Sequence, residues 1–290
     1  MSKLSYDENE FPFSEKEKEI YRQVKEIEPQ ISAFVMSIAS SLGLDLDGFS
    51  FRLKSASSLY EKLYLRDEMT NINSVKDLCR YTIVIPTEKY TEKVNEFLNI
   101  LRIYNQENIS FKNTWEIDSK YVGINSAFKS GDYLYEIQFH TPESLAVKNI
   151  NHKSYEKARL LPKDSIDRKN MEDEMMLASN NIIRPQNVLN INTDNNIYNK
   201  SLMEYTDANE KYPIKANLIL AYMEKQFPDE NNLHIIWGLK NNKEFLFSKK
   251  QIEKILSGNV TPKELKEIID YENETPAQYK TTIKNRDTVL

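Results

Sequence analysis

The sequence predicts an α/β to α+β fold in which helices flank a mixed sheet of about five strands. Two stretches carry this prediction. Residues 81–85, YTIVI, form a β-branched run that is typical of a central strand. In residues 133–141, YLYEIQFHT, aromatic or aliphatic side chains alternate with mostly polar ones, as expected for a strand with one core face. Apolar residues recur at helical spacing around these strands, so helices should cover the sheet.

Length and composition set the expected domain organisation. A chain of 290 residues suits one large or two modest domains. The linker is placed where asparagine is frequent and Pro185 interrupts the pattern. We expect an N-terminal helical arm at 1–48, a sheet-bearing domain at 49–180, a linker at 181–196 and a small C-terminal α+β domain of unknown role at 197–290.

Charge and cysteine content narrow the classes of function. The net charge of −5 offers no overall basic surface, so any phosphate binding should be local. Cys79 is the only cysteine, which excludes disulfides and cysteine-based metal sites. The N-terminus has no run of signal-peptide length, and no segment is long enough to span a membrane. We therefore expect a cytoplasmic site of action without a membrane partner, with export by a signal-free route as an open alternative.

The first helix has a clear start and an ambiguous middle. Ser14 and Glu17 form a capping-box pattern, and apolar residues follow at helical spacing. Pro29 is expected to kink or divide this helix, and Gly43 to stop it.

The later elements follow from the same two periodicities. Thr141 and Pro142 give the clearest helix start, since threonine caps a helix and proline suits its first turn. The expected strands are 49–54, 81–85, 111–117, 121–129, 133–141, 233–239 and 244–247. The expected helices after the first are 55–66, one capped by Thr87, then 141–160, 163–178, 214–226, 249–256 and 262–271.

The stretch 51–62, FRLKSASSLYEK, is the strongest functional signal. Arg52 and Lys54 lie on a short alternating segment, serines follow at a turn, and Lys62 comes one helical turn later. A serine-rich helix start offers amide donors, hydroxyls and a favourable helix dipole on which these cations converge. The pattern indicates a polyphosphate site, and a surface strand with a solvated basic helix is the alternative.

The second signal is the polar face of the strand at 133–141. An acid beside a phosphate site can hold Mg²⁺ or accept a proton, and simple exposure of this face to solvent is the alternative. The polar face carries Leu134, Glu136, Gln138 and His140, and the core face carries Tyr133, Tyr135, Ile137 and Phe139.

With both stretches in place, residues 49–159 resemble the synthetase domain of the RelA/SpoT family, whose (p)ppGpp synthetases move a pyrophosphate from ATP to the 3′-hydroxyl of a nucleotide. The family's ATP loop has Arg, Lys, Ser and Lys at fixed spacing, and Arg52, Lys54, Ser58 and Lys62 match every position. The resemblance implies a nucleotidyltransferase-type sheet. It also implies that the two lysines and Ser58 hold the ATP phosphates and that Arg52 packs against the adenine.

The catalytic residues are implied by the same resemblance. The family's Glu-Ile-Gln strand matches residues 136–138, so Glu136, beside Gln138, is expected to coordinate Mg²⁺ and to activate the acceptor hydroxyl. Asp77 is the candidate for the second magnesium ligand, although it precedes Arg80 by three positions where the family has five. Arg80 is counted among the ATP-binding residues.

The acceptor side resembles the family less closely. Where the family has a tyrosine after the loop glycine, this chain has Ile124, so guanine specificity is not implied, and Tyr121 is the substitute ring. The expected acceptor-binding residues are Lys112, Lys120, Tyr121, Gly123, Asn125, His140, His152 and Tyr155.

Residues 72–86, 120–128 and 136–144 look closest to the divergent RelA/SpoT-like domains of toxins and phage-associated polypeptides. The three histidines lack the family's hydrolase pattern, and a synthetase without a hydrolase would be harmful unless restrained. This favours a toxin or effector that acts on a nucleotide or a tRNA 3′ end and is held in check by an antitoxin or immunity protein. A non-catalytic nucleotide-binding or regulatory module and another nucleotide-dependent effector transferase are the alternatives.

Overall fold

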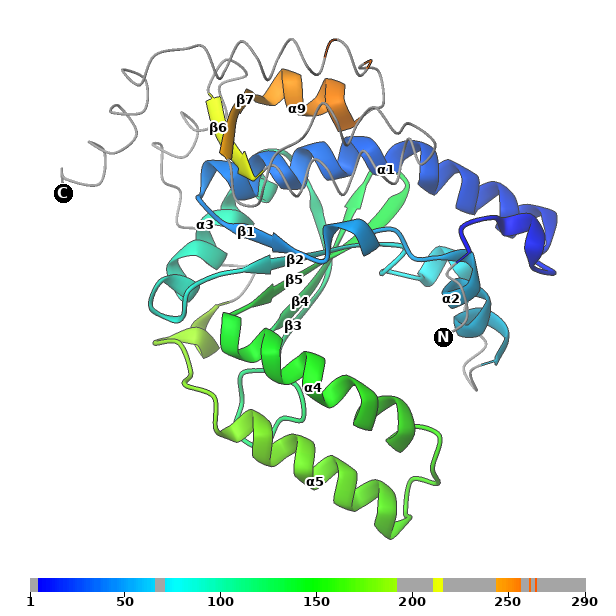
Figure 1. The fold of residues 1–290 in the computed structure, drawn as a ribbon, viewed down its shortest axis with the longest axis vertical. Coiled ribbons are helices and arrows are strands. Elements are labelled where there is room, and N and C mark those ends of the chain that lie inside the picture. The colour runs from blue at the N-terminus through cyan, green and yellow to red at the C-terminus, as the bar shows by residue number, and fades with distance from the viewer. Residues whose placement is uncertain are drawn as a thin grey trace. The chain divides into compact units, whose positions relative to one another are not determined.

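A five-stranded sheet of order β1-β2-β5-β4-β3 forms the centre of the first part of the chain (Figure 1). Its strands are β1 (Asp45–Asp47), β2 (Cys79–Val84), β3 (Glu107–Asn113), β4 (Ile124–Ser130) and β5 (Tyr133–His140). β2 and β5 run parallel and the other neighbours are antiparallel, so the sheet is mixed. The expected class, a mixed five-stranded sheet flanked by helices, is confirmed.

The computed structural model describes residues 5–65, 71–191, 211–215, 244–256, 261 and 264. The chain divides into two compact units, residues 1–207 and 208–290, and each is described by itself. Within the described residues, no helix is long and apolar enough to cross a membrane.

Helices cover both faces of the sheet. α1 (Glu15–Ser41) lies on the core face, where the Ser32 hydroxyl is 2.9 Å from the Tyr81 hydroxyl of β2. α3 (Tyr90–Ile103) lies on the same face, with the Phe97 ring 5.4 Å from the Phe139 ring of β5. α4 (Pro142–Ala158) covers the other face of β5 and is followed by α5 (Ile166–Asn180) (Figure 1). The polar face of β5 is therefore largely covered by protein.

The first helix begins as expected and continues further than expected. The capping box of Ser14 and Glu17 is confirmed. Pro29 does not divide the helix, which is continuous over 27 residues. Ile31, Val35 and other residues beyond the proline are buried, so packing on the sheet outweighs the missing backbone donor.

The expected strand at 49–54 is wrong. Gly48, at φ 61°, begins a 3-10 turn over Phe49–Phe51, and only Leu53 pairs, in an isolated bridge with Cys79. The unexpected β1 lies just before this turn. α2 (Ala56–Tyr60) follows and continues as a π-helical turn over Glu61–Leu65.

Residues 181–191, expected to begin a linker, pack within the first unit. Ile182, Val188 and Ile191 are buried there. The Val188 carbonyl accepts a hydrogen bond of 2.8 Å from the Asn113 side chain of β3. A polar composition did not prevent packing, because three apolar residues are spaced along the segment.

The second unit contains β6 (Lys211–Lys215) paired antiparallel with β7 (Glu244–Ser248), followed by α9 (Lys249–Leu256). The expected strand 244–247 and helix 249–256 are confirmed. The expected strand 233–239 and helix 262–271 fall outside the described residues except for Glu264, and the expected helix 214–226 begins within β6.

Candidate functional site

One carboxylate holds both lysines of the predicted phosphate loop. The Lys54 Nζ lies 2.9 Å from the Asp77 Oδ2, and the Lys62 Nζ lies 2.6 Å from the Asp77 Oδ1. Burial alone would raise the pKa of Asp77, but the two ammonium groups hold that pKa well below its usual range. Burial lowers the pKa of Lys54, and the charge of Asp77 opposes this effect. The three groups form a charged cluster with an excess of positive charge.

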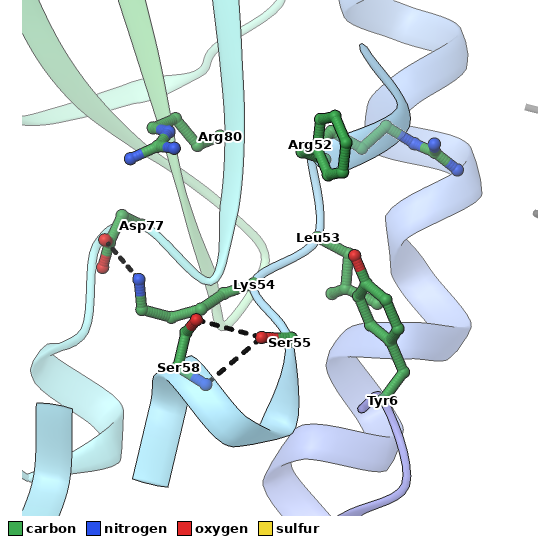
Figure 2. Close-up of a pocket in the computed structure, with 9 residues that line it drawn as sticks. Tyr6, Arg52, Leu53, Lys54, Ser55, Ser58, Asp77 and Arg80 are labelled. Carbon is green, nitrogen blue, oxygen red and sulfur yellow. Dashed lines mark hydrogen bonds and ion pairs between the residues drawn. The ribbon is translucent and has the colours of Figure 1, made fainter. Parts of the chain in front are cut away.

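A pocket of about 130 Å³ opens beside this cluster (Figure 2). Ser55 caps α2, and its hydroxyl accepts a hydrogen bond of 3.2 Å from the Ser58 amide and lies 3.0 Å from the Ser58 hydroxyl. The polar residues that line the pocket are Tyr6, Arg52, Lys54, Ser55, Ser58, Asp77 and Arg80. The structure thus places Lys54, Ser58, Asp77 and Arg80 around one pocket.

Arg52 takes a different place from the one expected. Its side chain points toward α1 and away from Lys54 (Figure 2). Its guanidinium forms a buried ion pair with Glu28, with Nη2 3.2 Å from Oε2, and lies 4.5 Å from the centre of the Phe49 ring. The residue is only 1% exposed. The expectation that Arg52 packs against an adenine is therefore corrected, because the buried Glu28 carboxylate requires a counter-charge and Arg52 supplies it.

Glu136 lies on the neighbouring strand, opposite Arg80. The parallel register of β2 and β5 pairs these two residues, which places their side chains on the same face. Burial raises the pKa of Glu136, and the negative charge of Asp77 raises it further. Asp77 is therefore near enough for its charge to act on Glu136, since charge interactions fade with distance.

A short hydrogen-bonded chain orients the Glu136 carboxylate. The Gln138 Nε2 donates to the Glu136 Oε1 at 2.7 Å, and the Lys148 Nζ of α4 donates to the Gln138 Oε1 at 2.7 Å. Burial lowers the pKa of Lys148 to about 8, with Arg80 contributing in the same direction. Sequence reasoning did not assign Lys148 to the site. Two features of the sequence involve Lys148: a row of polar side chains at helical spacing on α4, and a possible basic patch that would favour a tRNA acceptor.

The carboxylates suit a magnesium ion that is also bound by phosphates. Within the described part of the chain, no group of three or more His, Cys, Asp or Glu side chains could hold a metal. Mg²⁺ in nucleotide sites is bound by one or two carboxylates, substrate phosphates and water. Asp77 and Glu136 are the two carboxylates that could take part in a site of this kind.

Three of the expected acceptor residues form a hydrogen-bonded group. The Tyr121 hydroxyl donates to the Asn125 Oδ1 at 2.6 Å and lies 2.8 Å from the His140 Nε2. The His140 Nδ1 lies 2.9 Å from the Ser144 hydroxyl, and burial lowers the pKa of His140 to about 3. The imidazole is therefore neutral. At Gly123, a Cβ would lie 2.7 Å from the His140 Cε1, so glycine permits this close approach.

The other expected acceptor residues lie apart from that group. Lys112 is exposed on β3, and Lys120 pairs with Glu172 of α5 at 2.9 Å. His152 and Tyr155 are exposed on α4. These four side chains face solvent, and the structure does not bring them into the hydrogen-bonded group.

No protein-family model and no curated protein sequence matches the chain. Its backbone is similar to solved structures of three kinds. One is a chain from the crystal structure of the complex between the type VI effector Tas1 and its immunity protein. It is 18% identical, the match covers 58% of this chain and 96% of that chain, and the TM-score is 0.46. A GTP pyrophosphokinase family protein from Streptococcus pneumoniae is 15% identical over 57% and 89%, with a TM-score of 0.42. Small alarmone synthetase 1 from Bacillus subtilis, bound to its product pppGpp, is 16% identical over 44% and 67%, with a TM-score of 0.31.

Proposed function

We propose that the protein is an ATP-dependent pyrophosphokinase that transfers pyrophosphate from Mg·ATP to the 3′-hydroxyl of a nucleotide or of a tRNA end. One observation carries the proposal. Lys54, Lys62 and Arg80 gather around Asp77 and the strand that holds Glu136, so a cluster of cations adjoins a half-buried carboxylate.

The lysines are the phosphate-binding part of the proposal. Both lysines pair with the single Asp77 carboxylate, which leaves one positive charge over, and the ATP phosphates would take over as their partners. Arg80 lies on the exposed side of the same group and adds a third cation. Positioning and charge neutralisation account for most of the catalysis in phosphoryl transfer, so such a group is what the reaction requires.

Glu136 is the proton acceptor in the proposed reaction. The acceptor 3′-oxygen forms a bond to the β-phosphorus of ATP, the bond from that phosphorus to the α,β-bridging oxygen breaks, and AMP leaves. The hydroxyl proton moves to Glu136, whose raised pKa suits a general base. Asp77 and Glu136 would hold Mg²⁺, which when bound neutralises charge on the phosphates.

The group of Tyr121, Asn125 and His140 is the proposed acceptor side. Ile124 is fully buried, so it offers no surface to an acceptor base. Tyr121 is partly exposed and has its hydroxyl fixed by two hydrogen bonds, which leaves its ring as the stacking surface. We further propose an effector or toxin role under the control of an antitoxin or immunity protein, on the basis of the toxin-like segments in the sequence.

The double ion pair of Asp77 favours one other candidate, a non-catalytic nucleotide-binding module, because it commits the expected metal ligand to two lysines. Incubation with γ-labelled ATP and Mg²⁺ against GDP, GTP, ADP, AMP and bulk tRNA separates the two. A pyrophosphokinase places label on at least one acceptor, and Glu136→Gln abolishes labelling while ATP binding persists. Tight ATP binding with no labelled acceptor in the panel would instead indicate the binding module.

A further inference from the structure

The pocket has an apolar end that the phosphate-binding residues do not explain. Figure 2 shows Asp77 on one side of the pocket and Tyr6 on the other, with Lys54 between them. Phe51 and Leu53 also line the pocket. The Phe51 side chain is 61% exposed, which is unusual for a large apolar ring beside a charged cluster. Exposed apolar surface rimmed by polar residues is typical of a ligand-binding site.

Residues before and after Tyr6 in the sequence, Ser5 and Glu8, are both hydrogen-bonded to helices. The Ser5 carbonyl accepts a backbone hydrogen bond of 3.4 Å from Ser57 of α2. Glu8 is only 4% exposed, and its carboxylate accepts hydrogen bonds from Arg22 at 3.0 Å and Lys25 at 2.5 Å, both on α1. Tyr6 therefore lies in a segment that contacts both α1 and α2.

Two aromatic rings fasten the next turn of the chain. The Phe11 and Phe13 rings lie 5.5 Å and 6.0 Å from the Tyr60 ring of α2. Phe13 is 5% exposed, so this contact is part of the core. Residues 5–13 thus form a strap across α2, whose first turn carries Ser55 and Ser58, and the strap delivers Tyr6 to the pocket.

The usual cationic partner for a base is not accessible at this end. The Arg52 guanidinium is buried against Glu28, and Arg80 lies on the Asp77 side of the pocket, so the aromatic side chains that line the pocket are those of Tyr6 and Phe51 (Figure 2). Burial raises the pKa of the Tyr6 phenol, so the side chain stays neutral and adds no negative charge near the phosphates. Aromatic rings stack on nucleobases, whichever base it is, because every base has a π-face.

We propose that Tyr6, together with Phe51, binds the base of the nucleoside triphosphate whose phosphates contact Lys54 and Lys62, which makes residues 5–13 a part of the active site. This inference rests on the proposed function, because it names the base contact of the same nucleotide. The site would then have two ends of different chemistry, one cationic for the phosphates and one aromatic for the base.

Calorimetric titration of the full chain with ATP and with inorganic tripolyphosphate tests this inference, since tripolyphosphate has the charge and no base. Tyr6→Ala should weaken ATP binding by about 10-fold to 100-fold, the range for loss of one stacked base, and leave tripolyphosphate binding within about 2-fold of wild type. Tyr6→Phe keeps the ring and should bind ATP as wild type does. Tyr133→Ala, a partly exposed tyrosine of β5, is the matched control and should change neither affinity.

The remaining outcomes also decide the matter. Equal weakening of both ligands by Tyr6→Ala would show that the residue supports the phosphate site alone and would overturn the inference. Unchanged ATP affinity in the double variant Tyr6→Ala, Phe51→Ala would overturn it as well. If Tyr6→Ala fails to fold, Tyr6→Leu keeps apolar volume and the same comparison of ligands applies. If the wild-type protein binds neither ligand, both the proposed phosphate site and the inference about Tyr6 are wrong. If ATP binding depends on Tyr6 but no pyrophosphate is transferred, the proposed reaction is wrong and the inference about Tyr6 stands.

Discussion

Asp77 has two opposed roles at the scale of single residues. Its carboxylate pairs with Lys54 and Lys62, and in the proposed reaction it would help to hold Mg²⁺. In that reaction the phosphates would have to compete with an internal anion for the same two lysines. The lowered pKa of Asp77 contributes stability that is present above the ordinary carboxyl value of 3.8 and is lost as pH falls through the folded-state value.

The substitution Asp77→Asn separates these roles. Without Mg²⁺, it should tighten tripolyphosphate binding by roughly 10-fold, because the competing carboxylate is gone and a charge-assisted contact contributes about 1.5 kcal/mol or more. With Mg²⁺, pyrophosphate transfer should fall below detection. Asp164→Asn removes the same charge from an exposed position and should change neither quantity. Weaker tripolyphosphate binding by Asp77→Asn would show that the carboxylate arranges the lysines rather than competing for them.

Lys148 should set the alkaline limit of activity. Its pKa of about 8 means that Lys148 loses its proton as pH rises through that value. Gln138 then no longer accepts a hydrogen bond from a charged donor. The rate of transfer should therefore decline above pH 8. Lys148→Arg keeps the charge at higher pH and should move this decline upward in a pH–rate profile, at the cost of a lower maximum rate.

The lowered pKa of Lys148 also makes the free energy of unfolding depend on pH. Between about pH 8 and 10.5 the unfolded chain binds more protons at Lys148 than the folded one, so this group makes the free energy of unfolding rise with pH across that window. A decline in rate that does not move in the arginine variant would assign the alkaline limit to another group.

At the scale of elements, α1 is attached to the segment before α2 by a buried ion pair. Glu28 of α1 accepts hydrogen bonds from Arg52 and Ser32, and Ser32 lies against Tyr81 of β2. Glu28 is only 2% exposed. The helix, the sheet and the segment that leads to the lysines therefore share one polar network inside the core.

Removal of one partner from this network should be costly. Glu28→Ala leaves the Arg52 charge buried without its carboxylate and should lower the free energy of unfolding by about 3 to 5 kcal/mol. Glu26→Ala lies on the exposed side of the same helix and should change it by less than about 0.5 kcal/mol. Urea denaturation of both variants measures the difference. Similar stabilities would mean that Arg52 finds another partner or solvent when Glu28 is absent.

Elements with strong local signals could be predicted from the sequence. β5 followed from strict alternation, and α4 followed from the cap at Thr141 and the proline after it. The strand expected at 49–54 failed because Gly48 turns the chain into a 3-10 turn. β1 has only three residues, too few to show a period.

The candidate site was predictable in its residue types and less so in its pairings. Lys54, Ser58 and Asp77 do meet around one pocket. The position of Arg52 depended on Glu28, which lies 24 positions earlier and carries no local sign of being buried. Lys148 depended on how α4 packs against β5. Tertiary contacts of this kind are not encoded in a spacing.

At the scale of the whole molecule, the candidate site belongs to the first unit alone. Its residues, from Tyr6 to Lys148, lie within residues 1–207, where the sheet and the strap also lie. A net charge of −5 is distributed over the chain while cations gather at the site. The proposed phosphate binding would thus be a local property of this unit.

A chain that ends at Asp207 should fold and bind ATP with an affinity within about 3-fold of the full chain, because the residues that line the pocket all belong to the first unit. Thermal unfolding and calorimetric titration of the two chains provide the comparison. A truncated chain that fails to fold, or that loses ATP binding while folded, would assign part of the site to residues 208–290.

The parallel pairing of β2 with β5 affects when the candidate site forms during folding. β3, β4 and β5 follow one another as antiparallel neighbours and can form through local contacts, whereas β2 reaches β5 only across α3 and two strands. Closing so long a loop is entropically costly, and such non-local pairing forms slowly. Arg80 stands on one side of that junction and Glu136 on the other. On the ribosome, a chain that has emerged only as far as α3 has the lysines but lacks Glu136, so the proposed reaction would have to wait until β5 has been made.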